Sequence, residues 1–219
     1  MSIKEETNET SSNMSSNYQS PINTQSSNTK TKAKSSKLSL ANIHPDITFA
    51  KILLHILAEN KKSKDYFKKI NSNQDLHFTV KMKPTISLLD YLRRILKYIK
   101  IEFSTLIISM IYIDRICKEK VYLNEFNIHR VMLIAIYMAY TYNEDCIYDN
   151  KFLALVSGIS KSEMILLEED FLDLIDFKLF VSDELFEQYK NYFYMDLWDI
   201  ITLGRIKKIG FNLYILCML

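Results

Sequence analysis

Apolar positions recur with the period of an α-helix along most of this chain. After Asp46 they repeat every three or four residues, which predicts a first helix with one apolar stripe. The stripe consists of Ile47, Ala50, Leu54, Leu57 and Ala58. The mixed, lysine-rich stretch from residue 61 to Pro84 breaks this period and is therefore predicted to be mainly a loop.

Two more helices are predicted from capping and length. Ser87 and Asp90 have the spacing of a capping box, directly before the amphipathic run LLDYLRRILKYI. The next apolar run covers about residues 102–118 and contains many β-branched side chains. Because roughly sixteen residues are too many for a typical strand, this run is also predicted to be helical.

A fourth helix is predicted to be apolar on every side. It includes the uncharged run VMLIAIYMAY and follows Asn124, whose side chain is of the capping type. A helix that is apolar all round has to be surrounded by other helices. The run is too short to cross a bilayer, and the polar residues 143–145 end it.

Helices in the last part of the chain are predicted from their ends. The run NKFLALV stops at Gly158, a residue suited to the left-handed position after a helix. Ser160 and Glu163 form a second capping box, which opens a helix to about Asp176, and a last helix starts after Ser182. The predicted fold is therefore all-α, with five or six helices in a bundle around one central apolar helix.

Composition supports helices and argues against several classes of enzyme. Gly and Pro occur three times each among 219 residues, although strand-rich folds need both for their turns. The glycines stand apart, so no glycine-rich loop can hold a phosphate as in a P-loop enzyme, a Rossmann dehydrogenase or a kinase catalytic domain. No acid–base or nucleophile set is evident, so we expect no enzymatic activity and no small-molecule substrate.

Cysteine and histidine usage predicts neither a metal nor a cofactor. Cys117, Cys146 and Cys217 are scattered, which is typical of a reducing compartment, so the protein is expected inside the cell, in the cytoplasm or nucleus. The four histidines share no metal-ligand spacing. The apolar run IGFNLYILCML is shorter than a spanning helix, so no membrane partner is expected.

The two ends of the chain differ from its middle. Ser, Thr and Asn supply 21 of the first 40 residues, so residues 1–40 are predicted to be disordered. This segment takes five of the 28 basic and three of the 26 acidic residues, which leaves 23 of each. The neutral remainder gives no electrostatic reason to bind nucleic acid. A helical domain is expected over residues 41–195, followed by a helical tail over 196–219.

The stretch IISMIYIDRICK (107–118) places two charges inside an apolar pattern. Asp114 shares a helix face with apolar side chains, and Arg94 lies in the apolar stripe of the preceding helix. An unpaired buried carboxylate costs several kcal/mol. We therefore predict a buried ion pair between Asp114 and Arg94 that fixes the helix register. Arg115 points about 100° away from Asp114 and is the weaker candidate partner.

These motifs follow one another in the order found in one protein family. The stretches SLLDYLRRILKYI, IYIDRI, KFLALVSGIS and LEEDFLDLIDFKLFVSDELFEQY resemble the cyclin box of the P-type cyclins, called U-type in plants. The resemblance covers about residues 84–192, half of the chain. It implies a five-helix cyclin-box fold, here with extra helices at both ends. The remainder after Phe193 is too short for a second box of similar size.

The resemblance also implies a function in the control of the cell cycle and cell division. Cyclins carry no catalytic residue; they bind and activate a cyclin-dependent protein kinase, which is the partner expected for this chain. Glu168 falls where cyclins place a kinase-contacting glutamate. The other residues at the family's kinase-facing positions are Thr141, Tyr142, Leu172, Phe177 and Leu179. Of these, the leucines and Phe177 stand where apolar side chains receive a helix of the kinase.

Two features depart from the family's pattern. Thr141 stands where cyclins usually carry a lysine, so one charge-assisted contact to the kinase is missing. Arg93, Lys97 and Lys100 stand at apolar positions of the docking patch of cell-cycle cyclins. This basic row cannot receive a leucine-type docking motif. It is either a solvated face or a site for an acidic or phosphorylated segment.

Other functions remain as alternatives. The missing lysine suggests a cyclin-fold scaffold or adaptor that does not activate a kinase. A transcription adaptor that contacts DNA is disfavoured by the neutral charge of residues 41–219.

Overall fold

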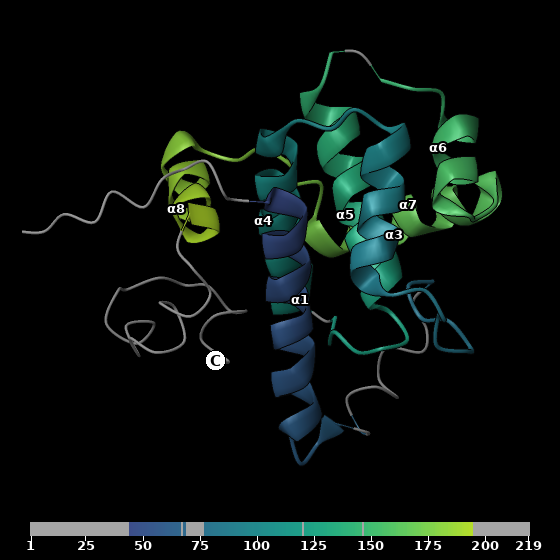
Figure 1. The fold of residues 1–219 in the computed structure, drawn as a ribbon, viewed down its shortest axis with the longest axis vertical. Coiled ribbons are helices and arrows are strands. Elements are labelled where there is room, and N and C mark those ends of the chain that lie inside the picture. Colours follow the sequence, from purple (N-terminus) through teal and green to yellow (C-terminus); the bar gives the residue numbers. More distant parts are fainter. Residues whose placement is uncertain (1–43, 67, 69–76, 120, 146, 195–219) are drawn as a thin grey trace, which may run out of the picture. The chain divides into compact units, whose positions relative to one another are not determined.

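A computed structural model describes residues 44–66, 68, 77–119, 121–145 and 147–194 (Figure 1). All of them belong to the compact unit Ser39–Leu219. The segment 1–40 and the tail 196–219, for which we predicted disorder and a helix, lie outside the described residues.

The described part of the chain is helical and contains no strand. Its helices, in chain order, are α1 (Pro45–Lys62), α3 (Leu88–Tyr98), α4 (Phe103–Glu119), α5 (Ile128–Asn143), α6 (Asn150–Ser157), α7 (Lys161–Ile175) and α8 (Asp183–Tyr194). The all-α prediction is confirmed. The helices α3 to α7 correspond to the predicted five-helix bundle, and α1 and α8 are the extra helices at its two ends.

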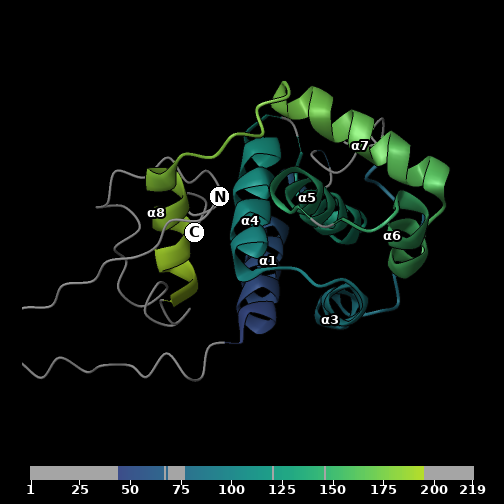
Figure 2. The same ribbon diagram turned by 90° about the horizontal axis from the view of Figure 1, so that it is seen from above.

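The helix α5 is the centre of this bundle. Every residue from Val131 to Tyr140 is buried, as the uncharged run predicted. The helix packs against α3, α4 and α7, and Figure 2 shows these three and α6 arranged around it. Outside the five, α1 and α8 both pack against α4, and the rings of Phe49 and Phe193 meet between them at 6.3 Å.

Local capping explains where several helices begin and end. The Ser87 hydroxyl accepts a hydrogen bond from the Asp90 amide at 3.1 Å and starts α3. Ser160 and Glu163 form a complete capping box at the start of α7. Gly158 ends α6 with φ 73°, a left-handed conformation that is strained for residues with a Cβ. These predicted boundaries are confirmed.

Two details of the predicted helices are wrong. The apolar stripe of α1 is rotated: Phe49, Leu53 and Ile56 are buried, whereas Leu54 is 45% exposed. Apolar residues occupy more than one side of α1, and its packing on α3, α4 and α8 selects the buried side. At the start of α5, the N-cap is Asn127. Asn124 instead accepts the Phe126 amide through its side chain and shapes the turn before the helix.

The predicted ion pair between Asp114 and Arg94 is also wrong. Asp114 is buried as expected, with 1% of its surface exposed, but its carboxylate pairs with Lys118 one turn along α4 at 2.6 Å. Arg94 is exposed, and its guanidinium group lies next to Gly158 at the end of α6. A Cβ atom added to Gly158 would be 3.6 Å from both terminal guanidinium nitrogens. The helix α3 buries Leu92 and Ile95 instead, so its inward face is turned away from Arg94.

This arrangement predicts different effects for two substitutions. Asp114→Ala removes a buried, charge-assisted interaction and should lower the free energy of unfolding by about 2 kcal/mol. Arg94→Ala changes an exposed side chain and should alter it by less than about 0.5 kcal/mol. Urea denaturation of the two variants measures both values. Equal losses in the two variants would restore the Asp114–Arg94 pair.

Candidate functional site

The residues predicted to face a partner come from three places in the fold. Thr141 and Tyr142 lie in the last turn of α5, and Glu168 and Leu172 lie on α7. Phe177 and Leu179 belong to the segment 176–181, which leads from α7 past α4 to α8 (Figure 2). Two buried tyrosines, one on α5 and one on α4, connect these three places.

Tyr137 connects α5 to Glu168. Its hydroxyl donates a hydrogen bond to the Glu168 carboxylate at 3.4 Å. Burial, together with the nearby Glu168 carboxylate, raises the pKa of Tyr137 to about 12. Partial burial also raises the pKa of Glu168 above its ordinary value, although the tyrosine hydrogen bond opposes this. The Glu168 carboxylate is therefore half-buried, incompletely solvated and held in place by one neutral donor.

Thr141 is directed back into its own helix. Its hydroxyl donates to the carbonyl of Tyr137 at 3.0 Å, one turn earlier. A lysine at this position would bring a positive charge to the end of α5 that carries Tyr137, but the threonine brings none. The position identified from the sequence as unusual is thus an internally bonded polar residue.

Side chains of α4 hold the segment 176–181 by its backbone. Arg115 donates one guanidinium N–H to the carbonyl of Lys178 and another to that of Phe180, the latter at 2.8 Å. The Tyr112 hydroxyl donates to the carbonyl between them, that of Leu179, at 2.8 Å. Three consecutive carbonyls therefore accept hydrogen bonds from α4. We call Tyr112 and Arg115 the carbonyl clamp.

The turn that leads into this segment is conformationally strained. Asp176 and Phe177 both have positive φ, 53° and 55°, although neither is glycine. The Phe177 amide donates to the carbonyl of Leu172 at 3.1 Å, which closes the end of α7. Positive φ in residues with a side chain costs free energy and is concentrated at functional sites. The surrounding contacts, including the carbonyl clamp, hold this turn in place.

The result is a half-buried acid on α7 and exposed aromatic side chains at the end of α5 and in the segment after α7. Phe177 is 66% exposed, Phe180 73% and Tyr142 52%. Burial raises the pKa of Tyr112 to about 12, and Tyr142 adds a smaller electrostatic contribution. Leu172 and Leu179 are partly buried and pack against the core. Such a surface can bind another protein through apolar contacts and one oriented carboxylate.

Sequence reasoning missed four residues of this arrangement. Tyr137 and Tyr112 stand in apolar runs and are indistinguishable there from core residues. Phe180 follows the predicted positions directly, but the pattern did not show which side of the segment faces outward. Arg115 was considered only as a partner for Asp114. Arg115 directly follows a buried acid and therefore leaves the helix on a different side. This position could have indicated that it contacts another segment of the chain.

The described residues contain neither a metal-binding group nor a membrane-spanning helix. No group of three or more His, Cys, Asp or Glu among them could hold a metal ion. No helix within the described ranges is long and apolar enough to span a membrane.

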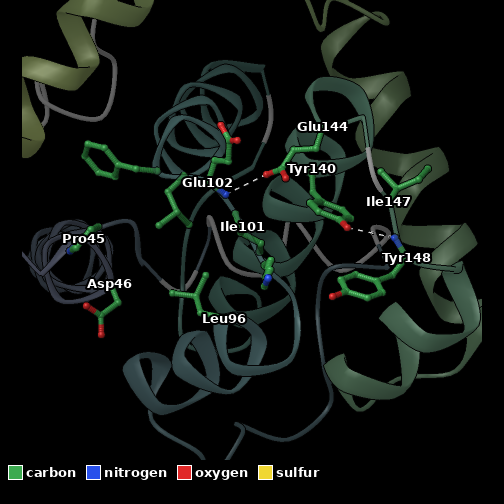
Figure 3. A pocket seen from close by; sticks show the side chains of 12 residues that line it. Pro45, Asp46, Leu96, Ile101, Glu102, Tyr140, Glu144, Ile147 and Tyr148 are labelled. Atoms are coloured by element: carbon green, nitrogen blue, oxygen red, sulfur yellow. Dashed lines mark hydrogen bonds between the residues drawn. The ribbon is translucent and has the colours of Figure 1, made fainter.

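A pocket of about 880 Å³ lies between the ends of α3 and α5 and the starts of α1 and α4 (Figure 3).

Comparison with known proteins gives one consistent result. The sequence matches the cyclin family over residues 4–179. It is 36% identical over 153 residues to Cyclin-U4-3 of Arabidopsis thaliana, which covers 68% of each chain. It is 37% identical over 112 residues to Cyclin-U4-1 of the same plant, covering 50% of this chain and 55% of that protein. For Cyclin-P4-1 of Oryza sativa subsp. japonica the identity is 37% over 109 residues, 49% and 51% of the two chains. The chain thus aligns with about half the length of the last two relatives.

The carbonyl clamp yields a prediction about local order. Arg115→Lys keeps the charge but loses the planar fork that reaches two carbonyls, so it should lower the free energy of unfolding by about 1–2 kcal/mol. Amide hydrogen exchange in residues 177–181 should accelerate more than exchange in α5. The exposed Arg93 provides the matched control, Arg93→Lys, for which neither quantity should change. Unchanged exchange in 177–181 of the Arg115 variant would rule out the clamp.

Proposed function

The chain belongs to the cyclin family, and we propose that it is a regulatory subunit that binds and activates a cyclin-dependent protein kinase in the control of cell division. Its relatives include U- and P-type cyclins, and members of this family act as regulators. The kinase would be bound by the end of α5, the outer face of α7 and the segment 176–181.

The observation that carries this proposal is the half-buried Glu168 carboxylate on α7, together with the exposed aromatic rings of the segment that follows this helix. The raised pKa of Glu168 means that the folded protein disfavours the charged form. A partner that brings an N–H donor or a cation to this carboxylate would compensate for the lost solvation. Phe177 and Phe180 would at the same time lose their exposed apolar surface to the partner. The free energy of binding is therefore most favourable for a partner that makes both the polar contact to Glu168 and the apolar contacts to the phenylalanines.

Activation would follow from selective binding and requires no catalytic group in this chain. A protein kinase exchanges between conformations in which a mobile helix is correctly or incorrectly placed. A partner that binds one of these conformations better shifts the equilibrium toward it. The clamped segment 176–181 suits this task, because a surface that is already ordered loses little conformational entropy on binding.

The proposal predicts that Glu168 matters for binding and not for folding. In Glu168→Gln, kinase recovered by affinity purification from the native cells should fall at least tenfold, since a charge-assisted contact is lost. The double variant Phe177→Ala/Phe180→Ala should show a similar loss. Met82, which is 82% exposed on another part of the surface, supplies the control Met82→Ala. Full recovery of an active kinase with the Glu168 and Phe variants would exclude this surface.

The raised pKa of Glu168 gives a separate prediction about pH. A carboxyl group whose pKa is higher in the folded than in the unfolded state favours folding most when it is protonated. The stability of the natural protein relative to Glu168→Gln should therefore decrease as the pH rises from about 4 to about 7. Urea denaturation at several pH values measures this difference. A difference that grows with pH would show that the carboxylate is stabilised by folding instead.

A second candidate function follows from Thr141. Without the usual lysine, the protein would be a cyclin-fold scaffold that binds a kinase but does not activate it. In that case the co-purified kinase would be inactive toward peptide substrates. Thr141→Lys would then restore activity, because it returns a positive charge to the end of α5. Activity in the complex of the natural protein would reject the scaffold.

A further inference from the structure

Positive charge is concentrated on one short part of the surface. Arg93, Arg94, Lys97 and Lys100 lie within eight residues, and all four are exposed. This is not a consequence of composition, because residues 41–219 contain equal numbers of basic and acidic residues. Arg93 pairs with Asp46 at 3.0 Å. Among the described residues Lys97 and Lys100 form no ion pair, and Lys97 lies over the Tyr98 ring at 5.4 Å.

The predicted basic row is divided by the end of a helix. Arg93 and Lys97 lie one turn apart on α3, which ends at Tyr98. Lys100 follows the end of the helix and lines the pocket of Figure 3 together with Leu96. The basic row therefore leads from the surface of α3 to the edge of a cavity. A basic row that is only a solvated helix face would not be expected to end at an apolar cavity.

The cavity is apolar and large enough for a side chain of a bound peptide. Its volume is about 880 Å³, and its apolar lining comes mainly from Leu96, Ile101, Phe103, Leu106, Ile147 and Tyr148. Three carboxylates also line it, and that of Asp46 is paired with Arg93. Glu144 accepts hydrogen bonds from the Glu102 amide at 3.0 Å and the Thr105 hydroxyl at 2.7 Å, so its charge is engaged at the start of α4 (Figure 3). Glu102 accepts from the Ser104 hydroxyl at 3.1 Å.

We propose that the basic row and this cavity form a docking surface for a phosphorylated peptide segment. A phosphoserine or phosphothreonine would contact Lys97 and Lys100, and an apolar side chain two to four residues away would enter the cavity. A phosphate carries nearly two negative charges at neutral pH and three acceptor oxygens, which matches two exposed ammonium groups that lack a carboxylate partner. Thr141 and Tyr142, proposed to contact the kinase, do not line this cavity, although Tyr140 and Glu144 on either side of them do.

Dimensions and charge favour a peptide over nucleic acid or membrane. From Arg93 to Lys100 the row extends over roughly 10 Å, about the length of three residues of an extended peptide. Nucleic acids and anionic membranes require wider basic surfaces, whereas residues 41–219 as a whole are neutral. Nucleic acid also has no apolar group to fill the cavity at the end of the row, whereas a peptide has apolar side chains.

The test uses the full chain and defined probes. The probes are three fluorescent pools of degenerate peptides, each with a central phosphoserine. Leucine stands two residues after the phosphoserine in the first pool, three in the second and four in the third. Matched pools replace phosphoserine by serine, or leucine by glycine. Fluorescence anisotropy should show at least tenfold tighter binding of one phosphorylated leucine pool than of its serine counterpart. Replacement of leucine by glycine should weaken binding of that pool, and added salt should weaken it as well.

Charge reversal locates the binding. Lys97→Glu/Lys100→Glu should abolish the preference for phosphoserine, and Ile147→Ser, at a 52% exposed position of the cavity, should abolish the preference for leucine. The control Lys81→Glu/Lys151→Glu has the same change in charge at exposed lysines elsewhere and should bind normally. Matching thermal unfolding curves of the two double variants exclude misfolding.

Three outcomes would overturn the proposal. Equal binding of phosphoserine and serine pools would show that the row is a solvated face. Equal binding by the two double variants would place the phosphate elsewhere. Tighter binding to a 20-base-pair DNA duplex or to vesicles with phosphatidylserine than to every peptide pool would assign the surface to those partners instead. None of these results depends on whether the chain binds a kinase.

Discussion

The burial of α5 on all sides is the constraint on which the rest of the structure depends. A helix whose residues from Val131 to Tyr140 are all buried cannot lie on a surface, so other helices must enclose it. The two tyrosine hydroxyls of this buried stretch then need partners inside the bundle. Tyr137 donates to Glu168, and Tyr140 accepts the amide of Tyr148. The central helix thus positions α7 on one side and the segment before α6 on the other.

The helix α4 shows how adjacent charges can serve different purposes. Asp114 and Arg115 are neighbours in sequence, but their side chains leave the helix about 100° apart. Asp114 points into the core and pairs with Lys118. Arg115 reaches the carbonyls of Lys178 and Phe180, and Tyr112 binds the carbonyl between them. A single turn of α4 therefore contributes both to the core and to the order of an exposed segment more than sixty residues away.

The two proposed surfaces rest on this framework in different ways. At the kinase-binding surface, strained backbone and a half-buried carboxylate are held in place by contacts from α4 and α5, while aromatic rings are left exposed. At the docking surface, exposed charges follow α3 to its end and meet an apolar cavity. The first surface depends on side chains that the core orders. The second surface depends on the end of α3 at Tyr98, because this places Lys100 at the edge of the cavity.

The sequence by itself determined the helical class, the central helix and most helix boundaries, because period, capping and uncharged length are local properties. It also identified the family through an ordered set of motifs. The partners of the buried and exposed charges were decided by the tertiary structure. Asp114 could be recognised as buried, and the spacing of Lys118, one turn along the same helix, already allowed the pair that forms. Whether Arg94 also reached the carboxylate depended on how α3 and α4 rotate against each other. The same reason explains the rotated stripe of α1 and the role of Arg115. A helical pattern gives the angle between side chains on one helix, and only packing gives the direction in which that helix faces.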